Sequence, residues 1–158
     1  MDRADEHDSR FSLSAEEYEA VQAAVASVAR TWAGGQPLTF NALFGRWKGV
    51  TARVEEGYSW CAPELANDIW CRSVLAQAWP LLPPRVQTVM GPELDRVDER
   101  YRRATVAWPG QSETEGEWWH RRVPRRLEVE PSELRDADWP LGWEMMPFPK
   151  PDSVEIYT

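Results

Sequence analysis

"TFNALFGRWKGVTARVEEG", residues 39–57, carries the clearest helical pattern in the chain. Its large apolar residues recur at intervals of three and four, which places them on one face of an α-helix. They are Phe40, Leu43, Phe44, Trp47, Val50 and Val54. Thr39 suits the N-cap position and Gly57 the helix stop. The stretch therefore predicts a helix with one buried face.

Two glycines, Gly45 and Gly49, lie four residues apart in this helix. That spacing favours close approach of a neighbouring helix. Arg46 and Lys48 exclude a helix facing lipid, because charged residues between the glycines would meet hydrocarbon.

A second amphipathic helix is expected on the N-terminal side, from residue 14 to residue 33. Ser14 and Glu17 have the spacing of a capping box, and Gly34–Gly35 ends the pattern. Its apolar face is formed by Val21, Val25, Val28 and Trp32.

Helical signals continue on the C-terminal side. Pro63 suits the first position of a third helix, which PLLPP at 80–84 ends. We expect residues 84–91 to form at most two turns that stop at Gly91, and Pro92 to begin a separate polar helix over 92–103. Two acid-first pairs support that helix: Asp98–Arg102 and Glu99–Arg103.

The last third of the chain changes character. Prolines recur at 124, 131, 140, 147, 149 and 151, a density that excludes long helices. Short strands are predicted at 117–123, 125–130, 142–146 and 153–157. Pro124 indicates an edge strand or a kink between two pieces.

These elements predict an α+β fold, in which four or five helices pack with a small C-terminal antiparallel sheet or extended layer. A mostly α fold with an extended C-terminal tail is the alternative. Residues 1–12 are expected to be a disordered leader and residues 13–158 a single domain. Within it, 13–108 is the helical part and 117–158 the strand or extended part, acidic and rich in tryptophan.

Composition limits the possible functions. The chain has 158 residues, 10 tryptophans and a net charge of −8, which disfavours general affinity for nucleic acid or anionic membranes. It begins with a charged stretch and has no apolar run near ~20 residues, so a cytoplasmic protein is expected, with its two cysteines reduced and buried. Its 18 basic residues include only two lysines, which with abundant alanine, tryptophan and proline is typical of a GC-rich bacterial genome.

Charge is unevenly distributed along the chain. Residues 127–158, hereafter the acidic tail, carry 8 acids and 2 bases, net −6. Residues 83–126 carry 7 acids and 9 bases, net +2.

The basic segment GEWWHRRVPRRLE, residues 116–128, has three interpretations. Its arginines pair with carboxylates of this chain across a small sheet, contact a protein partner, or bind nucleic acid. In the last two cases the candidate anion-binding residues are Trp118, Trp119, Arg121, Arg122, Arg125 and Arg126.

Catalytic patterns are weak. Two histidines and two cysteines match no metal spacing, and no phosphate-binding loop or nucleophile elbow occurs. Glu64 and Asp68 share a helix face, but the helix dipole and an ion pair to Arg72 explain both. We therefore predict no catalytic residue, no metal and no cofactor, and keep an enzyme with an unrecognised carboxylate or cysteine site as a third hypothesis.

In size, acidity and lack of catalytic motifs the chain resembles bacterial immunity and antitoxin proteins. That resemblance implies a cytoplasmic protein that inhibits or neutralises a basic partner, such as a toxin or nuclease. Carboxylates would attract the partner and tryptophans would anchor it. The candidate partner-binding residues are Glu128, Glu130, Glu133, Asp136, Asp138, Trp139 and Trp143. The alternative is a nucleic-acid-associated regulatory protein that uses residues 118–126.

Overall fold

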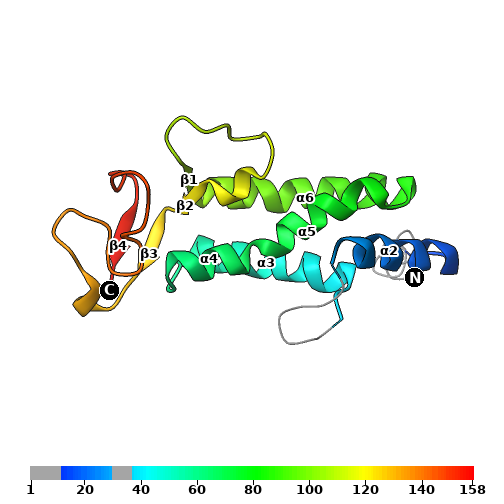
Figure 1. Cartoon of the computed structure of the whole chain (residues 1–158), viewed down its shortest axis with the longest axis horizontal. Helices are drawn as coiled ribbons and strands as arrows, with labels where there is room; N and C mark the ends of the chain where they lie inside the picture. Colours follow the sequence, from blue (N-terminus) through cyan, green and yellow to red (C-terminus); the bar gives the residue numbers. More distant parts are fainter. Residues whose placement is uncertain (1–11, 30–36) are drawn as a thin grey trace, which may run out of the picture.

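The computed structural model describes residues 12–29 and 37–158. Its α-helices are α2 (Ala15–Val28), α3 (Phe40–Glu56), α4 (Ala62–Asp68), α5 (Trp70–Ala78) and α6 (Pro84–Arg103). The strands are β1 (Thr105–Ala107), β2 (Arg122–Pro124), β3 (Arg126–Glu128) and β4 (Glu155–Tyr157), and short 3-10 turns form η1 (Trp79–Leu81), η2 (Trp118–His120) and η3 (Pro131–Glu133). Figure 1 shows the helices packed side by side, with β3, β4 and the tail loops at one end. The α+β prediction is confirmed.

The predicted N-caps of the first two helices are confirmed, whereas α2 ends at Val28, earlier than the predicted residue 33, because Ala29 is extended at φ −153° and ψ 137°. The Ser14 hydroxyl accepts from the Glu17 amide at 3.1 Å, and the Glu17 carboxylate accepts from the Ser14 amide at 3.1 Å. The Thr39 hydroxyl accepts from the Ala42 amide at 3.1 Å. These contacts satisfy amides that have no partner inside the helix. The predicted helix stop at 34–35, Trp32 and the expected leader, apart from residue 12, lie outside the described residues.

Gly57 ends α3 as predicted, and the structure supplies a second reason for a glycine there. Its φ is +127°, where residues with a side chain are strained. A Cβ at this position would lie 1.7 Å from the Tyr157 hydroxyl oxygen. That hydroxyl donates to the Glu56 carbonyl at 3.1 Å, so β4 reaches the end of α3 through this gap.

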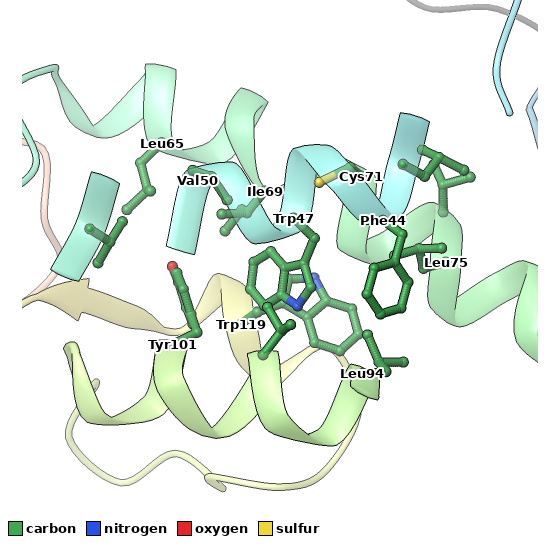
Figure 2. Close-up of a cluster of buried hydrophobic side chains, with 14 of the residues drawn as sticks. Phe44, Trp47, Val50, Leu65, Ile69, Cys71, Leu75, Leu94, Tyr101 and Trp119 are labelled. Atoms are coloured by element: carbon green, nitrogen blue, oxygen red, sulfur yellow. The ribbon is translucent and has the colours of Figure 1, made fainter. Parts of the chain in front are cut away.

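Helix α3 contributes the centre of the core and packs against α5 and α6. Its predicted apolar stripe is buried along its whole length. The Trp47 ring lies against Tyr101 of α6, with ring centroids 4.7 Å apart. Figure 2 shows Trp47 and Trp119 enclosed by apolar side chains of the surrounding helices, including Phe44, Leu75 and Leu94. Tryptophans thus fill the core that the helices share.

Two helix boundaries differ from the prediction. The expected third helix is two helices, α4 and α5, because Ile69 leaves helical geometry at φ −90° and ψ 0°. Conversely, α6 runs unbroken through Gly91 and Pro92. Its buried side chains form one stripe across that dipeptide: Val86, Met90, Leu94, Val97 and Tyr101. Burial of this stripe outweighs the local stop signal.

The strands form two separate pairs among the described residues. β1 pairs antiparallel with β2, and β3 pairs with β4 in parallel, so the expected antiparallel arrangement holds for the first pair only. Tyr58 adds a bridge to Leu127 on the other side of β3. The predicted strands at 125–130 and 153–157 contain β3 and β4, and Pro124 marks the kink between β2 and β3.

The other strand predictions need correction. Residues 118–120 are a 3-10 turn, because Trp118 and Trp119 are consecutive and both buried, which an alternating strand does not allow. Residues 141–145 are turns and Met146 has no regular structure; Gly142, at φ +91°, packs against Cys61. β1 was not predicted, because its three residues follow directly on a strong helical pattern.

Candidate functional site

The carboxylates of the acidic tail are exposed or partly exposed and unpaired. Four of the five predicted partner-binding acids are exposed and Glu133 is half-buried. No ion pair joins any of the tail's acids to a base within the described residues. The tail's two bases, Arg135 and Lys150, donate to backbone carbonyls instead. The tail therefore keeps its net charge of −6 at the surface.

The predicted cross-strand Arg–Glu pairs are absent from the described residues, because Arg122 of β2 and Arg125, which follows β2, bind the end of a helix. The Arg122 guanidinium is buried and donates to the Thr105 hydroxyl at 2.7 Å and to the Arg102 carbonyl at 3.1 Å. Arg125 donates to the Arg103 carbonyl at 2.9 Å. The last carbonyls of α6 lack partners within the helix and carry the negative end of its dipole. These arginines act as a C-terminal cap.

The other two arginines of the segment also bind carbonyls. Arg126 donates to the Glu56 carbonyl at the end of α3 at 3.2 Å and lies over the Tyr157 ring. Arg121 donates to the Glu115 carbonyl at 2.6 Å. The hypothesis of internal neutralisation predicted that these arginines pair with carboxylates of this chain. It was wrong about the acceptors, which are backbone carbonyls rather than carboxylates.

Trp118 and Trp119 belong to the core and are 3% exposed each. Trp118 lies under the Arg102 guanidinium at 4.1 Å, and Trp119 under that of Arg72 at 4.4 Å. The Trp119 indole donates to the Ser73 hydroxyl at 2.9 Å. Neither ring is open to a nucleic-acid base, so stacking on these rings is excluded in this conformation.

Trp139 and Trp143 are buried as well, so their rings are not available as partner anchors in this conformation. Trp139 donates to the Phe148 carbonyl at 2.7 Å and Trp143 to the Trp60 carbonyl at 3.2 Å. The two rings stack on each other at 6.3 Å between centroids. Together they fold the tail against the connection between α3 and α4.

That connection presents the tryptophan that sequence reasoning missed. Trp60 is 55% exposed and follows Tyr58, which is buried. Its position in the sequence could have indicated that it is exposed. Trp60 lies between a helix stop at Gly57 and a helix start at Pro63, outside every apolar stripe. An aromatic residue with no place in a core pattern is a candidate for contact with another molecule.

Beside Trp60 lies an open cavity of ≈ 540 Å³ between α3 and α4. Its lining includes Arg46, Gly49, Arg53, Trp60, Glu64 and Asp68. The three α3 residues follow one helix face at intervals of three and four, and Glu64 and Asp68 do so on α4. No atom lies within 4 Å of a Cβ built on Gly45 or Gly49, so the predicted close helix packing at these glycines is wrong. Gly49 borders the cavity instead.

Asp68 is a buried residue of the cavity lining that contacts three neighbouring side chains. It is 5% exposed and accepts from the Tyr58 hydroxyl at 2.8 Å. The guanidiniums of Arg46 and Arg53 lie 3.4 and 3.6 Å from its oxygens. Burial, and then the hydrogen bond to Asp68, raise the pKa of Tyr58, so its hydroxyl stays protonated. The predicted pair of Asp68 with Arg72 does not form, because Arg72 binds Asp98.

Two further cavities continue from the first along the surface. One, of ≈ 190 Å³, shares Arg53 and Trp60 with it and adds Glu56 and Glu128. The other, of ≈ 370 Å³, shares Ser59 and Glu128 with the second and adds Glu130 and Glu133. We call these three neighbouring cavities the Trp60 groove. It brings three of the five predicted tail acids, Glu128, Glu130 and Glu133, near the two arginines of α3, whereas Asp136 and Asp138 line none of the three cavities.

The described residues offer few catalytic groups. They contain no cluster of histidine, cysteine or acidic residues arranged to hold a metal. Burial raises the pKa of the Cys71 thiol to about 12, which disfavours a nucleophilic thiolate. Cys61, expected to be buried, is partly exposed. The Ser73 hydroxyl lies 2.8 Å from His120 Nε2, but Ser73 is 5% exposed, so this pair does not face a substrate.

Comparison with protein families, with curated proteins and with solved structures finds no match for this chain. No helix of the described residues has both the length and the apolar composition to cross a membrane. Function therefore has to be inferred from the geometry and charge of the surface.

Proposed function

We propose that this chain is a binding protein that neutralises a basic protein partner, in the manner of immunity and antitoxin proteins. One observation carries the proposal. Six acids outside the tail are ion-paired within the described residues: Glu17, Glu55, Asp68, Glu93, Asp98 and Glu99. None of the eight acids of the tail is.

An unpaired acidic surface has two physical consequences. It steers a positively charged partner toward the tail and raises the rate of association. It also leaves carboxylates free to pair with lysines and arginines, so that a cationic active site would be covered and inhibited. The resemblance in size and acidity to immunity proteins supports the same function.

The test is capture of a partner by the tagged protein, followed by titration with the purified partner. The test variant carries Glu128→Lys, Glu130→Lys and Glu133→Lys. We expect a near-stoichiometric basic protein that survives nuclease treatment, and a loss of about 100-fold or more in its affinity for the variant, since removal of interfacial charge pairs costs several kcal/mol.

The matched control changes the net charge equally, at Glu19→Lys, Asp95→Lys and Glu113→Lys. These three acids are exposed and also lack ion pairs. The control should bind the partner as the wild type does, apart from slower association. Equal affinity of the tail variant and the wild type would exclude the tail as the binding surface. Nucleic acid captured instead, and lost at higher salt, would support the alternative function.

A further inference from the structure

We propose that the Trp60 groove holds an extended, lysine- or arginine-containing segment of the basic partner, with Trp60 as its central contact. This inference rests on the proposed function and specifies the surface and the recognition element. The three cavities of the groove are neighbours, because each shares lining residues with the next: Arg53 and Trp60 line the first two, and Ser59 and Glu128 the last two.

The charge of the groove selects a basic occupant. Six carboxylates line it, at positions 56, 64, 68, 128, 130 and 133, against two guanidiniums at positions 46 and 53. This leaves a net charge of −4. Only Asp68 among the six has an ion pair within the described residues. The other five form no ion pair with a described residue and are available to cations of another chain.

Trp60 stands where the first two cavities meet, with carboxylates on both sides of it: Glu64 in one cavity and Glu128 in the other. An exposed indole flanked by carboxylates is a favourable site for a guanidinium or ammonium group, because the ring face attracts cations and the acids supply the countercharge. Arginine and tryptophan are also the residues that most often dominate binding energy at interfaces.

The main chain beneath Trp60 is held in place. Tyr58 bridges to Leu127 of β3 on one side of it. The Trp143 indole donates to the Trp60 carbonyl, and the Ala62 amide donates to the Gly142 carbonyl at 3.0 Å. The buried tryptophans of the tail thus act as positioning residues for the exposed one. A contact residue on a fixed main chain loses less entropy on binding.

The charged side chains of the groove also differ between its two ends. Arg46 and Arg53 lie at the α3 end, whereas Glu128, Glu130 and Glu133 lie at the tail end. A bound segment should therefore place its basic residues from Trp60 toward the tail. Neutral or acidic residues should face the two arginines. A segment of the opposite polarity would place its acidic residues against the carboxylates of the tail end.

The first test uses Trp60→Ala, with Tyr18→Ala as the matched control, because Tyr18 is 57% exposed and lies on α2. The probe is a fluorescent peptide of alternating arginine and alanine residues, with the alternating glutamate and alanine peptide as its counterpart. Fluorescence anisotropy should show binding of the basic peptide alone. We expect Trp60→Ala to weaken it about tenfold or more and Tyr18→Ala to leave it unchanged.

The second test fills the groove without disturbing the fold. Gly49→Gln places a side chain in the first cavity, whereas Gly45→Gln adds the same side chain to α3 outside it, and a Cβ meets open space at both positions. Both variants remove a glycine from a helix interior, which favours folding. Only Gly49→Gln should weaken peptide binding.

Unchanged peptide affinity in both Trp60→Ala and Gly49→Gln would overturn this inference. Captured partner that is lost with the tail charge reversals but retained by these two variants would overturn it as well, while leaving the proposed function intact. Thermal unfolding of each variant separates a local effect from a failure to fold.

Discussion

At the scale of single residues, Asp98 is a buried carboxylate that links three helices of the core. It accepts from the Trp47 indole at 3.0 Å and from two nitrogens of Arg72 at 2.9 Å each. Asp98 and Arg72 are 5% and 8% exposed. This one carboxylate therefore ties α3, α5 and α6 together, and its negative charge is compensated only inside the fold.

We expect Asp98→Ala to lower the free energy of unfolding by about 3–5 kcal/mol, since it leaves the Arg72 guanidinium buried without its carboxylate. Glu99→Ala is the control one position along. Glu99 pairs with Arg102 and Arg103 at the surface, so its loss should cost about 0–1 kcal/mol. Urea denaturation of the three proteins measures both values. Similar losses for the two variants would contradict the role of Asp98.

His120 gives the folded chain a sensitivity to acid. Burial lowers its pKa, so the folded state binds a proton less readily than the unfolded chain, whose histidine titrates near pH ~6.5. The Trp119 indole donates to Ser73, which leaves the Ser73 hydroxyl proton free to donate to the neutral His120 ring. Stability is therefore full above the unfolded-state pKa and decreases as the pH falls through it.

The prediction is that His120→Gln loses less stability than the wild type between about pH 7.5 and about pH 5.5. Urea unfolding at both pH values gives the comparison, in which the carboxylates common to both proteins cancel. Equal losses in the two proteins would show that His120 titrates alike in the folded and unfolded states.

At the scale of elements, α6 contains a proline, Pro92, that removes one of its backbone hydrogen bonds. Pro92 lies inside the helix, where it lacks the amide hydrogen that would bond to the Thr88 carbonyl. Pro84 stands at the start of the same helix, where that amide has no partner in any case. The two prolines are both exposed and differ mainly in position.

We expect Pro92→Ala to raise the free energy of unfolding by about 1–3 kcal/mol, because it restores a backbone hydrogen bond. Pro84→Ala should change it by less than about 0.5 kcal/mol. Calorimetry of both variants and the wild type measures these changes in the free energy of unfolding. Destabilisation by Pro92→Ala would mean that α6 requires the proline for its shape.

The helices could be predicted where one apolar stripe and one cap agreed, as in α3 with Thr39 and Gly57. Prediction failed where a local signal and a longer pattern disagreed. Gly91–Pro92 is a strong stop signal, yet the stripe from Val86 to Tyr101 continues through it. The tail was harder, because the pairing of β3 with β4 and with Tyr58 joins segments far apart in sequence.

At the scale of the whole molecule, the charged residues of the helical part and those of the tail have different roles. The helical part uses acids and bases to hold helices together, and the basic segment 121–126 caps the ends of α3 and α6. The tail's acids form no ion pair among the residues that the structure describes. The partition of net charge was visible in the sequence, and so were the acidic candidates. The exposure of Trp60 was not, because it depends on how the tail folds against residues 58–62.

The hydrogen bond from Tyr157 to the Glu56 carbonyl joins residues 101 positions apart. Contacts of such long separation are slow to form, since the intervening chain loses entropy on closure. Helices α3 to α6, built on local contacts, are expected to form first and the β4 docking last. The tail side of the Trp60 groove is thus completed at the final folding step. A partner bound there would slow unfolding by holding that last step closed.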